Sequence, residues 1–167
     1  AVSNAGALGS LPCAMLAPDA LRAELTALAA ATTRPYNVNF FCHTPPEPDP
    51  GREARWRDAL RPYHEALGLD VDSIAPGAGR LPFSEASAEL LEAFRPRVVS
   101  FHFGLPSPAL LARVRAWGAC VLASATTVDE ALWLEAHGVD AVIAQGLEAG
   151  GHRGIFLSED LSTKVPT

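Results

Sequence analysis

The chain has 167 residues, with 19 acidic and 13 basic side chains and a formal net charge of −6 at pH 7. This acidic balance argues against nucleic acid as a partner, because phosphate binding needs a surface rich in Lys and Arg. Hydrophobic residues make up 49% of the chain, enough for a buried core, but no apolar run reaches the roughly 18 residues that a membrane-spanning helix needs.

The three cysteines, Cys13, Cys42 and Cys120, form no CxxC pair and have no histidine at metal-ligand spacing. An odd count without such pairs argues against a disulfide framework and against a structural zinc site. We therefore expect no metal and a reducing, cytoplasmic setting.

In the N-terminal part, short apolar runs alternate with helical patterns. The first six residues resemble the last turn of a helix that ends at Gly6, and residues 7–11 predict a strand. The next segment begins at Pro18 and predicts a helix. Its apolar residues fall on one face: Leu21, Leu25 and Leu28.

Residues 36–41 are aromatic and β-branched and predict a second strand. The proline-rich segment 44–50 that follows can continue neither a strand nor a helix. Residues 51–94 then contain two helical patterns separated by a loop at 76–79, and Ser84 supplies the N-cap of the second helix.

The C-terminal half has the clearest boundaries. Ser107 followed by Pro108 predicts the start of a helix that ends at Gly118. Thr127 and Glu130 have the spacing of a capping box, in which each side chain bonds the backbone N–H of the other, and they start the next helix. Apolar runs predict strands around these helices: residues 98–103, 120–124 and 141–145.

Strands that are continuous apolar runs, separated by helices, indicate an α/β protein with a parallel sheet. The periodicity fits an open doubly wound sheet as well as an arc of a barrel. A complete TIM barrel takes roughly 250 residues, so this chain is too short to close one. No segment has the composition of a linker between two domains.

One glycine-rich segment has a misleading pattern. Residues 77–82 read GAGRLP and begin like a dinucleotide-binding fingerprint. The third glycine is replaced by Pro82 and no apolar strand precedes the segment, so no helix N-terminus would lie under a pyrophosphate. We interpret it as a plain loop.

The most informative segment follows the last predicted strand, where residues 145–154 read QGLEAGGHRG. Ligands bind at the carboxyl ends of parallel strands in open sheets and barrels alike. Gly150 and Gly151 allow the backbone to approach a planar ligand or a phosphate closely. His152 can exchange a proton near neutral pH, and Arg153 offers a positive charge to an anion. The alternative is a glycine-rich turn whose histidine is merely exposed.

Other polar residues lie at predicted strand ends. His102 points to the opposite face from its phenylalanine neighbours, where a hydrogen-bonded core histidine is the favoured interpretation, and His43 could border the same mouth. Asn39 and Ser124 could face a ligand or simply be solvated. Ser124 lacks the G-x-S-x-G context of a nucleophile.

Four segments, in the same order along nearly the whole chain, resemble the nitronate monooxygenases, also called 2-nitropropane dioxygenases. They are NAGALG at 4–9, YNVNF at 36–40, FHFGLP at 101–106 and EAGGHRG at 148–154. The family is an FMN-dependent TIM barrel. The resemblance implies a partial TIM barrel with about five of the eight βα units, corresponding to the second through sixth strands. Residues 1–167 are then a single incomplete domain without the first strand and the last two units.

The resemblance also implies a reaction, in which FMN and molecular oxygen oxidise an alkyl nitronate to a carbonyl compound and nitrite. The catalytic residue of the family corresponds to His152, near the flavin N5, where it deprotonates a nitroalkane or holds the anionic nitronate. Some family members have Lys where this chain has Ser124. The cofactor-binding residues implied for FMN are Asn39, Ser124, Gln145, Gly150 and Gly151.

The loops that normally hold the FMN phosphate in such a barrel have no counterpart in the sequence, so we expect the chain to be part of a longer protein. Two other functions stay open. One is a flavin-dependent enoyl-acyl-carrier-protein reductase that uses NAD(P)H and has a similar Gly-Gly-His segment. The other is a non-catalytic fragment of such a barrel. The sequence is also compatible with a homo-oligomer.

Overall fold

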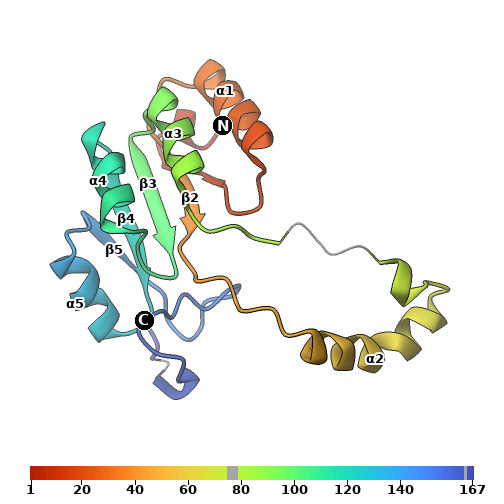
Figure 1. The fold of residues 1–167 in the computed structure, drawn as a ribbon. Coiled ribbons are helices and arrows are strands. Elements are labelled where there is room, and N and C mark those ends of the chain that lie inside the picture. The colour runs from red at the N-terminus through yellow and green to blue at the C-terminus, as the bar shows by residue number, and fades with distance from the viewer. Residues whose placement is uncertain (75–78, 164) are drawn as a thin grey trace. The chain divides into compact units, whose positions relative to one another are not determined.

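The structure is a computed structural model that describes residues 1–74, 79–163 and 165–167. Within these residues, five parallel strands form one sheet, and each pairs with the next in the sequence (Figure 1). The strands are β1 (Gly9–Pro12), β2 (Tyr36–Phe41), β3 (Val98–His102), β4 (Cys120–Ala125) and β5 (Ala141–Ala144).

The strand order decides between the two architectures that the sequence allows. In a doubly wound sheet the order reverses at a switch point, whereas in a (β/α)8 barrel neighbouring strands follow one another in the chain. Here the order is β1-β2-β3-β4-β5 without reversal. The predicted α/β class is confirmed, and the fold is a partial TIM barrel.

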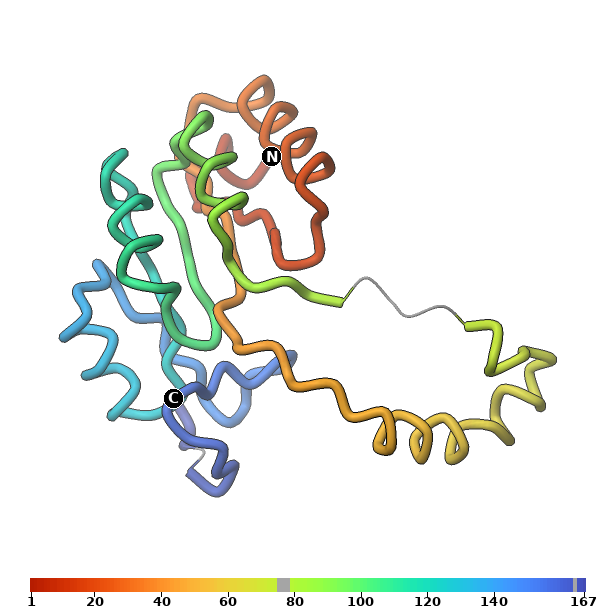
Figure 2. Tube along the Cα trace, viewed as in Figure 1, coloured from red at the N-terminus to blue at the C-terminus, as the bar shows by residue number. Residues whose placement is uncertain are grey.

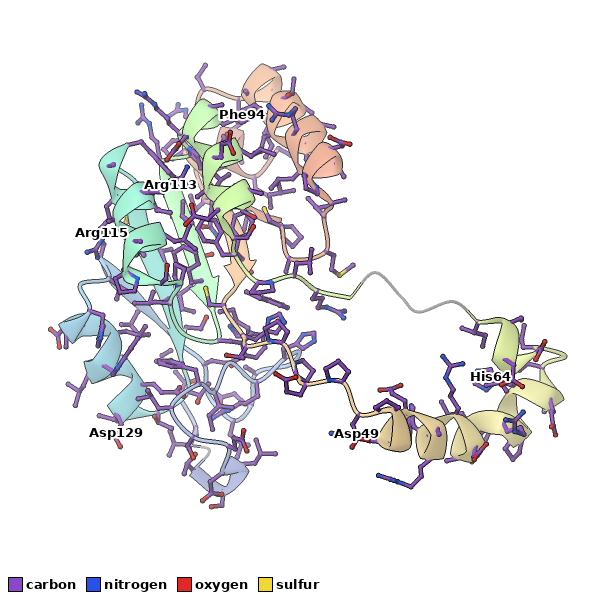
Figure 3. All side chains as sticks on the ribbon, viewed as in Figure 1. Asp49, His64, Phe94, Arg113, Arg115 and Asp129 are labelled. Atoms are coloured by element: carbon purple, nitrogen blue, oxygen red, sulfur yellow. The ribbon has the colours of Figure 1, made fainter. Side chains whose placement is uncertain are left out.

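The helices that connect these strands are α1 (Pro18–Ala31), α3 (Glu85–Phe94), α4 (Pro108–Ala116) and α5 (Val128–Ala136). Helix α3 contacts α1 and α4, and α5 contacts β4 and β5. The guanidinium of Arg113 on α4, labelled in Figure 3, forms ion pairs with Glu85 and Glu92 of α3, the latter at 2.8 Å. These pairs are partly exposed and therefore contribute little to stability.

The helices end where local signals predict. Ser84 and Ser107 accept hydrogen bonds from backbone N–H groups in the first turns of α3 and α4. Gly118 has a φ of 83°, which closes α4 in the left-handed conformation that glycine adopts without strain. At the start of the chain, the predicted helical turn is a short 3-10 helix, Ser3–Ala5, followed by Gly6 at φ 95°.

Alternate residues of the three central strands, β2, β3 and β4, are buried in a core that they share with the helices, whereas all four residues of β5 are exposed. Burying the core side chains provides the main stabilisation of the fold. Strand and helix residues form one continuous core, in which these are fully buried: Leu25, Val38, Leu91, Val99, Phe101, Val114, Val121 and Leu134.

The intervening strand residues form the other face of the sheet, which we call the polar face. Asn37, Ser100 and Ser124 are buried on it although they are polar. Burying a polar group is costly unless it is hydrogen-bonded, so packed cores contain few such groups. A face with several of them, close to the carboxyl ends of the strands, is typical of a ligand-binding site. The polar groups on this face come from Ser10, Asn37, Asn39, Ser100, His102 and Ser124. The same face also carries Pro12, Phe41, Val98, Cys120, Leu122, Ala141 and Ile143.

Residues 45–79 form a separate compact unit that contains α2 (Pro50–Ala66) and a short 3-10 helix (Val71–Ser73). The Asp49 carboxylate caps α2 by accepting from the backbone N–H of Arg52. Both helices predicted between residues 51 and 94 are therefore confirmed. Most of the loop predicted at 76–79, and part of the GAGRLP segment, lie outside the described residues.

Several local predictions are wrong. The strands predicted at 7–11 and 141–145 are Gly9–Pro12 and Ala141–Ala144 in the structure. The third predicted strand, 98–103, ends one residue earlier, because Phe103 has a φ of 67°. The capping box is only half formed, since the Thr127 hydroxyl accepts from the Glu130 N–H but the Glu130 carboxylate bonds Thr126 instead of Thr127.

Among the described residues, no helix combines the length and apolar character needed to cross a membrane.

Candidate active site

The carboxyl ends of β2, β3, β4 and β5 lie along one edge of the sheet, because the strands are parallel. After β5, the chain folds back along this edge (Figure 2, blue). We call residues 146–157 the return loop. It carries His152 to the ends of β2 and β3.

Aromatic rings gather where the return loop meets β2 and β3. The Phe41 ring lies 5.6 Å from the rings of both His102 and His152, and 5.0 Å from that of Phe103, measured between centroids. The His43 ring lies 6.1 Å from Phe103. We call these five residues the aromatic cluster. On one side, the His152 ring faces the aromatic rings of this cluster. The His152 side chain is nevertheless exposed to solvent.

The return loop is fastened to the sheet through the Gln145 side chain. Its Nε2 donates to the His152 carbonyl at 2.9 Å, and its Oε1 accepts from the Gly154 N–H at 2.7 Å. The His102 Nε2 lies 3.1 Å from the same His152 carbonyl and donates to it. The main chain at His152 is thus held from two directions independently of its imidazole.

Glycines in the return loop serve two different purposes. A Cβ on Gly154 would lie 2.5 Å from the His102 Cε1, so this glycine is required by close packing within the chain. A Cβ on Gly150 or Gly151 would meet nothing within 4 Å. Gly151 has a φ of 80°, which explains its identity, whereas Gly150 has no such reason in the described structure. Open space beside Gly150 suits the approach of a flat ligand.

Arg153 is half-buried, and its guanidinium donates to the carbonyls of Gln145 at 3.3 Å and Thr126 at 3.1 Å. Its positive charge is therefore fixed at the carboxyl ends of β4 and β5. Its Nε is buried and has no hydrogen-bond partner in the described part of the chain. A fixed cation beside His152 favours an anionic ligand.

A chain of amide and hydroxyl groups crosses the polar face. The Asn37 Nδ2 donates to the hydroxyls of Ser10 and Ser100, both at 2.8 Å. The Asn39 Nδ2 also donates to the Ser100 hydroxyl at 2.8 Å. Since the NH2 group of Asn39 is engaged in this way, its Oδ1 is the atom left to accept a hydrogen bond from a ligand.

Ser124 is 8% exposed and lies on the polar face one residue before the end of β4. Gln145 follows β5 directly, and both of its amide atoms are used by the return loop. The flavin contacts assigned to Ser124 and Gln145 stay predictions.

Sequence reasoning missed Phe41, Phe103 and Glu130. The left-handed conformation of Phe103, rare for a bulky residue, turns its ring into the aromatic cluster, and such backbone strain is common at functional sites. The Phe-Gly pair at 103–104 was the available signal, since a glycine after a strand marks a sharp turn. His102 is not enclosed in the core but half-buried on the polar face.

Three histidines belong to the aromatic cluster, but they do not form a metal centre. In residues 1–74, 79–163 and 165–167, no three His, Cys, Asp or Glu side chains come together as metal ligands.

The His102 imidazole should make stability depend on pH. Burial lowers its pKa, an effect that the hydrogen bond to the His152 carbonyl opposes and the neighbouring His152 charge reinforces. The unfolded chain, with a His pKa of about 6.5, then binds a proton more readily than the folded one, so stability falls as the pH drops below about 6.5.

We expect the free energy of unfolding to fall from about pH 7 to about pH 5 more steeply in the wild type than in His102→Gln. The glutamine keeps an N–H donor for the His152 carbonyl but cannot titrate. Urea denaturation at several pH values measures both slopes. Parallel slopes would assign the pH dependence to other groups.

Known proteins are similar to this chain in sequence and in fold. A family model described as nitronate monooxygenase matches residues 1–166. A protein named nitronate monooxygenase from Paraburkholderia phytofirmans is 42% identical over 100% of this chain, and one from Pseudomonas aeruginosa is 44% identical over 95% of it. In each case the match covers 46% of the relative, so the chain spans about half the length of these relatives.

Solved structures are also similar to this chain. A nitroalkane oxidase from Streptomyces ansochromogenes superposes with a TM-score of 0.82 and 36% identity, covering 99% of this chain and 47% of that one. The structure of FabK from Thermotoga maritima superposes with a TM-score of 0.60 and 25% identity, covering 93% of this chain and 38% of that one.

Proposed function

The chain belongs to the nitronate monooxygenase family, and we propose that the protein oxidises alkyl nitronates with molecular oxygen to carbonyl compounds and nitrite, using FMN. The observation that carries the proposal is the position of His152. Its loop is folded back over the strand ends, between an aromatic cluster and a fixed guanidinium. This arrangement suits a small anion that must lie beside a flat ring system.

The residues of the site fit FMN in two respects. The bare main chain at Gly150 and Gly151 has open space where a ring could approach. The Asn39 Oδ1 is oriented as an acceptor by the bond from its Nδ2 to Ser100, which suits the N–H of a flavin ring. Bound FMN would supply the electron acceptor for the substrate and pass the electrons to oxygen. Ser124 and Gln145 are further candidates for contacts with it.

In this proposal His152 handles the proton of the substrate. Its imidazole removes the α-proton of a neutral nitroalkane, or donates a hydrogen bond to an oxygen of a nitronate that is already anionic. Arg153 beside it attracts the negative charge. The rings of Phe41 and Phe103 exclude water from the side of His152 that they cover, which strengthens both interactions.

The test is anaerobic mixing of the purified intact gene product with the anion of 2-nitropropane, with the neutral nitroalkane, and with NADH. We expect the nitronate to bleach the yellow flavin absorbance and NADH not to bleach it, and nitrite to form once air is admitted. Bleaching by NADH alone would favour the enoyl-acyl-carrier-protein reductase. A colourless protein that releases no flavin on denaturation would favour the non-catalytic fragment.

Two further expectations accompany this proposal. We propose a reducing, cytoplasmic setting, on the ground that the three cysteines are an odd count without a CxxC pair. A homo-oligomer and the absence of nucleic acid partners stay predictions of the sequence.

A further inference from the structure

Glu130 is a buried carboxylate that does not act as the helix cap suggested by its sequence position. It is 1% exposed in the first turn of α5, while its neighbour Asp129 points to solvent (Figure 3). The Thr127 hydroxyl already caps this helix by accepting from the Glu130 N–H at 3.2 Å. Capping therefore does not explain why a carboxylate is buried here.

The Glu130 carboxylate accepts four hydrogen bonds from two different parts of the chain. Its Oε2 accepts from the backbone N–H of Thr126 at 2.7 Å and from the Thr126 hydroxyl at 2.8 Å. Its Oε1 accepts from the backbone N–H groups of Phe156 at 2.6 Å and Leu157 at 3.2 Å. Such a set of donors offsets the cost of burying the charge.

These bonds join the end of the return loop to the end of β4. Thr126 is 2% exposed, and its carbonyl accepts from the Arg153 guanidinium. The Phe156 ring packs 5.3 Å from that of Trp133 on α5, and also against Gly104, where a Cβ would lie 3.2 Å from it. The return loop is thus held at His152 and Gly154 by Gln145, and farther along at Phe156 and Leu157 by Glu130.

We propose that Glu130 is a positioning residue that holds the return loop so that His152 stays over the aromatic cluster, an inference whose catalytic part rests on the proposed function. Glu130 touches neither His152 nor the open space beside Gly150. It acts through the backbone of Phe156 and Leu157. An amide in its place offers a single acceptor atom, and so cannot serve both the β4 end and the return loop.

The first measurement needs no variant. Hydrogen exchange followed by NMR or mass spectrometry should show the amides of Phe156 and Leu157 to exchange more slowly than those of Gly150 and Gly151, because they donate to a buried carboxylate. If they exchange as fast as the amides of Gly150 and Gly151, Glu130 does not hold the loop and the proposal is wrong.

The second measurement compares Glu130→Gln with Glu135→Gln, a change of an exposed residue on the same helix. In Glu130→Gln we expect faster exchange confined to residues 150–158, and a fall in kcat of about 10- to 100-fold, since small displacements of a catalytic group are this costly. FMN content should stay within about twofold of the wild type, because Glu130 lies outside the proposed contacts. Glu135→Gln should match the wild type in all three respects.

The outcomes separate this inference from the proposed function. If the wild type lacks nitronate activity but exchange in Glu130→Gln rises only in the return loop, the proposed function fails and the positioning role stands. If activity is present and Glu130→Gln changes neither exchange nor kcat, the positioning role fails alone. Faster exchange throughout the sheet would also overturn it, because Glu130 would then support the whole fold.

Discussion

Replacing His152 with alanine is expected to lower nitronate turnover by about 10²- to 10⁴-fold, the range for the loss of an acid–base group. The variant should fold and bind FMN nearly as well as the wild type. The reason is that Gln145 and His102 hold the His152 carbonyl and not its imidazole. Removing the side chain therefore leaves the return loop fastened.

Steady-state kinetics and the flavin released on denaturation test this result together. His137→Ala is a suitable control, because His137 is an exposed histidine at the end of α5. It should retain full turnover. A His152→Ala enzyme with wild-type kcat, or one that has lost its flavin, would contradict the assigned role.

The second large effect is expected at Gly154. A Cβ there would lie 2.5 Å and 2.9 Å from the Cε1 and Nδ1 of His102, and 3.2 Å from the Gln145 Oε1. An imidazole ring packed among Phe41 and Phe103 has little room to move away. Gly154→Ala should therefore cost about 1–3 kcal/mol of unfolding free energy, as overpacked sites do. Turnover should fall about 100-fold as the return loop shifts.

Gly150→Ala is the matched variant, since its Cβ would meet nothing within 4 Å. Without flavin, its stability should lie within about 0.5 kcal/mol of the wild type. With flavin, its affinity should be weaker, because the new methyl group occupies space proposed for the ring. Urea denaturation and flavin titration of both variants distinguish protein packing from ligand contact. Equal stability of Gly154→Ala and the wild type would contradict the packing argument.

The sequence alone predicted the elements with local signals. Helix α4 begins after Ser107 and ends before Gly118. A hydroxyl cap and a left-handed glycine act within a few residues, so both ends could be predicted from the sequence. The strands were recognisable because short runs rich in β-branched and aromatic residues lie between helical patterns. The position of the EAGGHRG segment after the last strand predicted the candidate site, since ligands gather at that edge of a sheet.

Only the tertiary structure revealed the features that depend on residues far apart in the sequence. Periodicity fitted two sheet architectures, and only the pairing of each strand with the next identified the barrel arc. His102 and His152 are separated by 50 residues, and only the strand register and the return loop bring them together. Glu130 has the sequence pattern of a helix cap, but burial against Phe156 and Leu157 gives its carboxylate other partners. The spacing of residues in the sequence determines which hydrogen bonds a side chain can form with its chain neighbours. The packing of distant segments determines which donors reach it in the folded protein.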